Sequence, residues 1–349
     1  KATGQFSNFI GYVIAGDTIK GNLSVVSNML DSDEIMGEEE ETAEEEEALS
    51  VIEIPGNIDF NMDAVVANLI YDSLNMKNIK AQLLVKDSKA EIKSFSFDML
   101  GGVIKLAGYY SSKDIAKPLV DISNIEIQNC DILSTYKAFG TVQKLAPIAE
   151  KCSGLYSCKL NMSCLLDNEM MPVLNTINGE GEISSSDMLI KSSDVILKIA
   201  EKLKKDDLKE MKLKDMKFKF NLINGDIVLN PFETSINNNQ AIVSGKSGLD
   251  QSLDFKCAMK VPRKNLGGSA NSVIDNLVSG AASKGINVSD DGNVDISMFV
   301  KGTMTDPKIS FDLIQSLSSL KQDLMGQAKD MIDAKKKELE DKAKVELEK

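Results

Sequence analysis

The most chemically reactive side chains in this sequence are five cysteines, Cys130, Cys152, Cys158, Cys164 and Cys257. No two of them have the C-x-x-C spacing of a zinc site or of a thioredoxin-like redox site. Cys158 and Cys164 fall in one predicted strand, where their separation is roughly 20 Å, far beyond the ~7 Å that a disulfide allows between Cα atoms. We therefore expect the cysteines to be buried as small apolar side chains, with no metal site.

Other catalytic patterns are also missing from the sequence. It contains no histidine, the residue most often used as a general base near neutral pH and the most common metal ligand. Gly101-Gly102 and Gly179-Glu180-Gly181 lack the spacing of a phosphate-binding loop that opens a helix, so we interpret them as strand ends and bulges. Asp290-Asp291 precedes Gly292 in a predicted turn. We expect no catalytic residue and no cofactor, and hence a protein that is not an enzyme.

Charge and length limit the partners. The chain has 349 residues, 42% of them hydrophobic, which is enough for one large β domain or two ordinary ones. Its net charge of -13 opposes binding to nucleic acid phosphates or to anionic headgroups. Nucleic acid is therefore excluded as a partner, and any contact with lipid must be mainly apolar.

The elements expected to carry any site are β-strands. Most of the chain alternates apolar and polar residues with period two, which indicates half-buried antiparallel strands. In residues 155–166 one side carries only apolar residues, namely Tyr156, Cys158, Leu160, Met162, Cys164 and Leu166. Residues 95–99, 216–222 and 253–261 repeat the pattern, and Asn224-Gly225 favours a type I′ hairpin after the second of these segments.

Helices are predicted less often, at residues 61–75, 132–144, 193–204 and 270–282. Ser193 is the expected N-cap of the third helix, whose apolar side would cover the sheet. Residues 313–349 predict a long amphipathic helix with a charged end. Residues 31–48 contain two blocks of glutamate and predict a solvated acidic loop, because like charges repel.

The apolar strand faces are the strongest functional signal. Methionine is flexible and polarisable, so a face rich in Met, Leu and Phe suits variable shapes such as acyl chains. Our candidates for a lipid groove share this character and are Tyr156, Leu160, Met162, Leu166, Phe218, Phe220, Leu222, Phe255 and Met259. Period-two alternation is equally typical of a filled core, so the pattern leaves an open groove and a closed interior as alternatives.

Several segments carry a resemblance to a known family. The segment Met170–Ile183 (MMPVLNTINGEGEI) is the longest of them. Asn224-Gly225 leading to Pro231-Phe232-Glu233, Ser244-Gly245 with Leu249–Ser252, and Gly302-Thr303 with Asp306–Lys308 agree with it. Together they resemble the C-terminal region of the AsmA family, over roughly residues 51–310.

The resemblance implies a mainly β fold made of elongated, strongly curved antiparallel sheet, with a few covering helices. Residues 1–150 would form an N-terminal β repeat, 151–312 the AsmA-like C-terminal β domain and 313–349 the charged helix. It also implies a periplasmic protein, anchored to the inner membrane by a segment outside this sequence, that moves phospholipid or maintains the outer membrane.

Phospholipid acyl chains and other envelope proteins are the partners that this family likeness implies. The sequence begins at Lys1 with no initiator methionine and no signal pattern, so we expect it to be part of a longer protein. The alternative function is a structural or protein-interaction β module of the envelope with a closed core.

Overall fold

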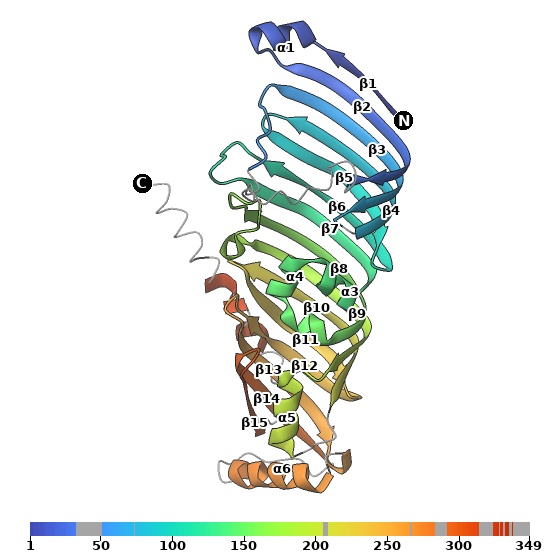
Figure 1. Cartoon of the computed structure of the whole chain (residues 1–349). Helices are drawn as coiled ribbons and strands as arrows, with labels where there is room; N and C mark the ends of the chain where they lie inside the picture. Colours follow the sequence, from blue (N-terminus) through green and yellow to red (C-terminus); the bar gives the residue numbers. More distant parts are fainter. Residues whose placement is uncertain are drawn as a thin grey trace, which may run out of the picture. The chain divides into compact units, whose positions relative to one another are not determined.

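The structure is a computed structural model of the whole chain (Figure 1). It describes residues 1–32, 51–72, 74–204, 209–265, 267–282, 292–313, 324–327, 329–330, 332–334 and 337. The predicted acidic loop therefore lies outside the described residues apart from its first two positions, and so do Asp290-Asp291 and most of the predicted C-terminal helix.

The predicted mainly β fold is confirmed. Fifteen strands are hydrogen-bonded in sequence order from β1 to β15. The pairs β1–β2, β3 to β7 and β10 to β15 are antiparallel, whereas β2 and β3 run parallel. The chain divides into two compact units: unit 1 is Lys1–Ala138 with Ser157–Gly179, and unit 2 is Phe139–Tyr156 with Glu180–Lys349. The domain boundaries drawn from the sequence stay predictions.

Unit 1 is built on long neighbouring strands. They are β1 (Ala2–Ser7), β2 (Ile19–Asp31), β3 (Ile58–Tyr71), β4 (Leu74–Lys86), β5 (Lys89–Met99), β6 (Gly102–Ser111) and β7 (Leu119–Asp131). Helix α1 (Phe9–Ala15) joins β1 to β2, and α3 (Ile132–Ala138) follows β7. Strand β8 (Cys152–Leu165) has most of its residues in unit 1, as does the 3₁₀ turn η2 (Leu174–Thr176).

Unit 2 combines strands with helices. Its strands are β9 (Asn178–Lys191), which begins in unit 1, β10 (Glu210–Ile223), β11 (Asp226–Ile236), β12 (Asn239–Ser247), β13 (Ser252–Pro262), β14 (Asn293–Thr303) and β15 (Pro307–Leu313). Its helices are α4 (Gly140–Leu145), α5 (Asp194–Leu203) and α6 (Gly267–Ala282), with 3₁₀ turns η1 (Pro147–Lys151) and η3 (Arg263–Asn265).

The strand and hairpin predictions agree with the structure. The alternating segments at 95–99, 155–166, 216–222 and 253–261 lie in β5, β8, β10 and β13, with only Leu166 beyond its strand. Asn224 and Gly225 connect β10 to β11 with φ angles of 53° and 81°. A type I′ turn requires positive φ at both central residues, which Asn and Gly tolerate best, so the predicted hairpin is confirmed.

Three of the four internal helices are also confirmed. The Ser193 side chain accepts a hydrogen bond from the Ile196 N–H at 3.3 Å, and so caps α5 at its N-terminus as predicted. The segment 270–282 lies in α6. Residues 132–144 form two short helices, α3 and α4, in place of a single one. Of the predicted C-terminal helix, Leu313 ends β15 and residues 324–327 and 332–334 are helical.

The helix predicted at residues 61–75 is wrong, because these residues form most of β3 and the start of β4. The positions of Val65, Leu69 and Ile70 fit a helical side locally. In the structure, however, β3 pairs with β2 from Ile58 to Ile70 and with β4 from Asp59 to Tyr71. Pairing on both sides satisfies the backbone along the whole segment, and this tertiary context outweighs a short helical pattern.

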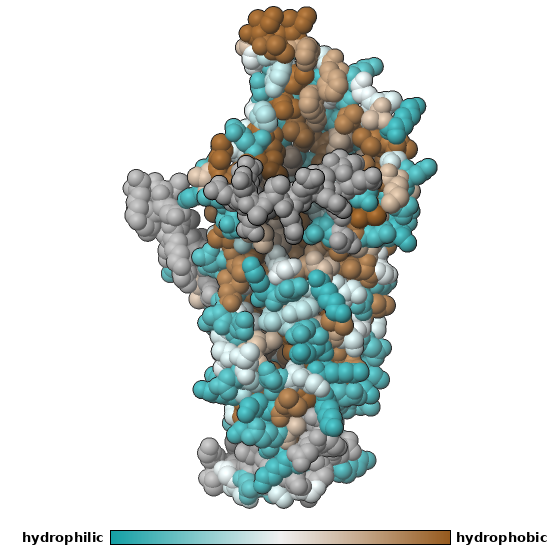
Figure 2. Space-filling view, in the orientation of Figure 1, coloured by the Kyte–Doolittle hydropathy of each residue, from teal (hydrophilic) through white to brown (hydrophobic). Residues whose placement is uncertain are grey.

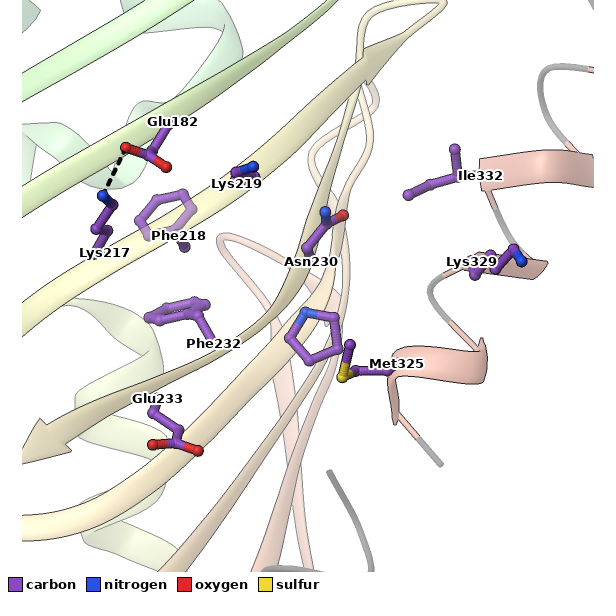
Figure 3. A pocket seen from close by; sticks show the side chains of 11 residues that line it. Glu182, Lys217, Phe218, Lys219, Asn230, Phe232, Glu233, Met325, Lys329 and Ile332 are labelled. Atoms are coloured by element: carbon purple, nitrogen blue, oxygen red, sulfur yellow. Dashed lines mark ion pairs between the residues drawn. The ribbon is translucent and has the colours of Figure 1, made fainter. Parts of the chain in front are cut away.

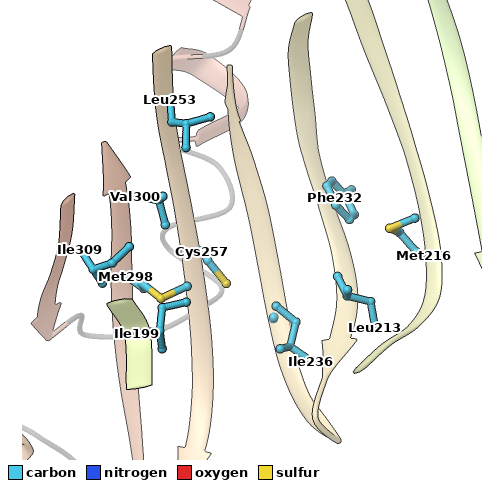
Figure 4. Packing of buried hydrophobic residues seen from close by; sticks show 11 residues of the cluster. Ile199, Leu213, Met216, Phe232, Ile236, Leu253, Cys257, Met298, Val300 and Ile309 are labelled. Atoms are coloured by element: carbon cyan, nitrogen blue, oxygen red, sulfur yellow. The ribbon is translucent and has the colours of Figure 1, made fainter. Parts of the chain in front are cut away.

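Unit 2 has a filled apolar core (Figure 4). Ile199 of α5 packs with side chains from β10 to β15, namely Leu213, Met216, Phe232, Ile236, Ala241, Leu253, Cys257, Met298, Val300 and Ile309, all of them buried. Helix α6 places Ile274 in a second cluster with Val261, Val294, Ile296 and Leu313. Helices α5 and α6 therefore cover the apolar side of these strands.

Among the described helices, none combines the length and the apolar character that crossing a bilayer requires.

Replacing Ile199 by alanine tests whether α5 holds this core. Ile199 is only 4% exposed, so the change leaves a cavity, and we expect the free energy of unfolding to fall by about 2–5 kcal/mol. Leu197, on the same helix, is 50% exposed, and Leu197→Ala should cost under about 1 kcal/mol. Urea denaturation followed by circular dichroism measures both, and equal losses would contradict the packing of α5.

Candidate functional site

One face of the sheet of unit 1 is apolar. Residues directly opposite each other on neighbouring strands share a face, so the strand register sorts the side chains into rows. Three rows cross the sheet: Phe6, Gly21, Phe60, Val85, Ala90, Tyr110 and Val120; Gly4, Leu23, Met62, Leu83, Ile92 and Gly108; and Ala2, Val25, Ala64, Ala81, Phe95, Leu106 and Ile125. We call these three rows the apolar face of unit 1.

The opposite face of the same strands is mainly polar. The Lys86 ammonium lies 3.1 Å from a carboxylate oxygen of Asp59 on the neighbouring strand. Gln82 donates to Asp63 at 3.0 Å, and Ser94 donates to Gln82 at 3.3 Å. These groups can remain hydrated, and the exposed ion pair adds little stability. Each strand of unit 1 thus separates a wet side from an apolar side.

The apolar face of unit 1 is only partly covered. Its large side chains on β2 to β7 are half-buried, namely Leu23, Val25, Phe60, Met62, Leu83, Val85, Ile92, Phe95, Leu106, Tyr110, Val120 and Ile125. Figure 2 shows apolar side chains gathered in a hollow over the first of these strands. Of the helices of unit 1, α1 contacts β2 and α3 contacts β7, the strands next to them in the chain.

Aromatic rings are arranged along this face. The Phe6 and Phe60 rings meet edge to face, with their centroids 5.6 Å apart. Gly21 lies between them in the row, and a Cβ atom there would come within 2.9 Å of both rings. The glycine therefore lets the two rings close over the backbone of β2. Phe95, in the third row, lies 4.8 Å from the ring of Phe97, which is buried.

The groove residues predicted from the sequence fall into two groups. Phe218, Phe220, Leu222, Phe255 and Met259 come together in unit 2, where Phe220 and Leu222 are buried and the other three pack against the core cluster around Ile199. Tyr156, Leu160 and Met162 lie on one face of β8 and are half-buried, while Leu166 follows that strand and is buried.

The half-buried side chains of β2 to β7 did not figure among the predicted site residues. The sequence contains a signal that could have pointed to them. The internal helix predictions that the structure confirms all begin after residue 131, so none of them falls among β2 to β7. The helix expected at 61–75 would have covered the sheet, but these residues belong to β3 and β4.

A pocket of about 670 Å³ opens within unit 2 (Figure 3). Strands β10 and β11 contribute the stacked rings of Phe218 and Phe232, whose centroids are 4.7 Å apart. Met325 and Ile332 line the pocket from the helical C-terminal residues. An ion pair of 3.1 Å between Lys217 and Glu182 lies at its border. The lining combines apolar side chains with five charged ones, and it contains no histidine or cysteine.

The cysteines are buried, as expected from the sequence, and all five are free. Burial raises the pKa of the Cys152 thiol to about 11 and that of Cys158 and Cys257 to about 12. The pKa values of Cys130 and Cys164 are also raised by burial. The thiolate is the nucleophile and the metal ligand, so these side chains are inert near neutral pH. Within the described parts of the chain, no cluster of three or more Cys, Asp or Glu could hold a metal ion.

No protein-family model, no curated protein and no solved structure matches this chain. The AsmA resemblance therefore stays a prediction from the sequence.

Thiol labelling tests the burial of the cysteines. At pH 8 the folded chain should take up almost no iodoacetamide, because all five thiols are buried and their pKa values are raised. Intact mass spectrometry should show five additions once the chain is unfolded in guanidinium. Leu197→Cys, at an exposed position, should add one label in the folded state. Rapid labelling of a native cysteine before unfolding would disprove its burial.

Proposed function

We propose that this chain binds lipid acyl chains along the apolar face of unit 1 and performs no covalent chemistry. The observation that carries the proposal is the three rows of apolar residues, whose large side chains on β2 to β7 are half-buried. An apolar surface left partly exposed to water gains free energy when hydrocarbon covers it, at ~0.8 kcal/mol for each methylene buried. Acyl chains need no hydrogen-bond partner, and the rows contain only one polar group, the Tyr110 hydroxyl.

The dimensions suit such a ligand. Seven strands at a spacing of ~4.8 Å extend the face over roughly 29 Å across the sheet. One leaflet of a bilayer contributes about half of its ~30 Å hydrocarbon thickness. The face is thus about twice as long as one acyl chain in a leaflet, so a bound chain could occupy more than one position along it. Several equivalent positions favour movement of a ligand over its capture in one deep pocket.

Charge supports apolar recognition over headgroup recognition. The net charge of -13 disfavours anionic headgroups near the protein surface. Lipid headgroups would remain in water while their acyl chains contact the rows. The resemblance to the AsmA family supports phospholipid as the natural ligand, and lipid transport or outer-membrane maintenance in the periplasm as the setting; these remain part of the proposal.

A different role is favoured for unit 2. Its core is filled by α5 and α6, which is the arrangement expected of a structural or protein-interaction module. The pocket lined by Phe218, Phe232 and Met325 offers this unit an apolar surface for a partner. The two roles are compatible, because they concern different parts of the chain.

Two substitutions on β3 test the ligand-binding face. Met62 lies on the apolar face, opposite Leu83, whereas Val65 lies on the other side of the same strand and is 51% exposed. Met62→Asp places a charge where hydrocarbon should lie, so it should weaken binding of a fluorescent fatty acid at least ~10-fold, or about 1.4 kcal/mol. Val65→Asp should change the affinity by less than about twofold.

Both variants must keep the wild-type circular dichroism spectrum for the comparison to count. Met62→Ala, which keeps the face apolar and adds no charge, serves as a second control in case aspartate perturbs folding. Equal affinity of folded Met62→Asp and wild type would rule out this face as the binding surface. Stoichiometric phospholipid in native mass spectra of the gently purified chain would support the proposal independently.

A further inference from the structure

Helix α1 exposes an unusual amount of apolar surface. It is formed by Phe9–Ala15 (FIGYVIA) and contains no charged residue. Four of its side chains are largely open to solvent: Phe9 is 62% exposed, Ile10 72%, Val13 63% and Ile14 80%. None of its residues is buried. Single exposed apolar side chains are ordinary, but a cluster of this kind marks an interaction surface.

The exposed residues form one continuous side of the helix. At 100° per residue, positions 9, 10, 13 and 14 fall within roughly 140° of arc. Gly11 and Tyr12 lie on the other side and are half-buried. Helix α1 contacts β2, so its apolar side points away from its own sheet.

The helix is firmly held in this orientation. Asn8, at its N-terminus, donates a side-chain hydrogen bond to the Thr18 carbonyl at 3.0 Å. Gly16 ends the helix with φ of 69°, and its N–H bonds to the Tyr12 carbonyl at 3.1 Å. Asn57, just before β3, donates to the Gly16 carbonyl at 3.3 Å. Both ends of α1 are therefore hydrogen-bonded to residues just before β2 and β3, and these bonds hold its apolar side in the exposed orientation.

The uncharged, apolar character of this surface favours a lipid bilayer over a protein as its partner. Residues 2–16 contain no acidic or basic side chain. A protein interface normally surrounds its apolar centre with a polar rim that forms hydrogen bonds, and charged side chains are common in such a rim. A helix that lies in a membrane interface buries its apolar side in the boundary between headgroups and acyl chains. The helix has seven residues, so it can lie in this boundary and cannot cross the membrane.

The apolar surface near α1 continues into the apolar face of unit 1. Phe6, at the end of β1, is 63% exposed and begins the row that continues through Gly21 and Phe60. It precedes α1 by three positions in the chain. Hydrocarbon in contact with α1 would therefore meet the apolar face of unit 1 at Phe6.

We propose that α1 inserts into the interfacial layer of a bilayer and brings lipid to the apolar face of unit 1. The second half of this statement rests on the proposed function, while the insertion stands on α1 alone. Because the chain is acidic, the contact should favour zwitterionic surfaces and weaken on anionic ones. This dependence is opposite to that of helices that bind membranes through lysine and arginine.

The absence of tryptophan from the chain makes a direct test simple, because one introduced indole gives the only tryptophan signal. Ile14→Trp places it at the most exposed position of α1. With phosphatidylcholine vesicles its emission should shift to the blue, and lipids brominated on the acyl chain should quench it by at least half. Leu197→Trp, on α5 and also exposed, should show neither effect.

A second pair of measurements separates insertion from ligand binding. The double variant Ile10→Asp/Ile14→Asp should float with phosphatidylcholine vesicles at least tenfold less than the wild type. Its affinity for a fluorescent fatty acid in the absence of vesicles should stay within twofold, since α1 lies outside the three rows.

The outcomes distinguish the two proposals. An unquenched indole in Ile14→Trp, together with intact fatty-acid binding, would overturn the membrane contact and leave the proposed function standing. A quenched indole without fatty-acid binding would support the contact and reject the function. Stronger flotation with anionic than with zwitterionic vesicles would point to contact through basic side chains and would overturn the role of α1.

Discussion

The constraint on which this structure depends is the alternation of side chains along each strand, combined with the register between strands. Successive residues point to opposite faces, so a register that aligns one pair of apolar residues aligns all of them. In unit 1 this produces rows such as Leu23, Met62, Leu83 and Ile92 on four neighbouring strands. A shift by one residue would move these side chains to the polar side, next to Asp59 and Lys86. The backbone ladder and the apolar rows therefore specify the same register.

An apolar sheet face is stabilised when other apolar groups cover it, and the two units differ in how far their own helices supply this cover. In unit 2 the cover belongs to the chain itself, because Ile199 of α5 and Ile274 of α6 enter clusters of buried strand residues. In unit 1 the large side chains of the three rows on β2 to β7 stay half-buried, while Val66, Ile79, Phe97 and Ile104 farther along the same strands are buried. Helix α1 turns its own apolar side outward. Unit 2 thus uses its face for stability. Unit 1 retains surface whose free energy of burial is available to a ligand or a membrane.

Much of the fold could be predicted from local patterns. Period-two alternation identified β5, β8, β10 and β13, Asn224-Gly225 identified a hairpin, and Ser193 identified the start of α5. These features depend on neighbouring residues, so the sequence expresses them directly. The segment 61–75 failed because its state depends on β2 and β4, which pair with it on both sides. The candidate site was harder to predict, since the same alternation in Phe220 and in Met62 leads to burial in one unit and to partial exposure in the other. Whether a face is covered depends on where a helix such as α5 packs, and alternation within a strand does not encode this.

The parallel pairing of β2 with β3 has a consequence for the rate at which the chain folds. Most other strands pair with the next strand through a short turn, such as the one between Lys86 and Lys89, so these contacts are local and form quickly. The β2–β3 pair instead joins Ile19 to Ile58 and Asp31 to Ile70, across a much longer stretch of chain. Closing that loop costs more entropy before any ladder hydrogen bond is gained. Within unit 1 the hairpins from β3 to β6 can therefore assemble first, and β2 joins them late, bringing β1 and α1 with it. Among the strands of unit 1 from β1 to β6, the part that we propose to meet the membrane would then be the last to take its place.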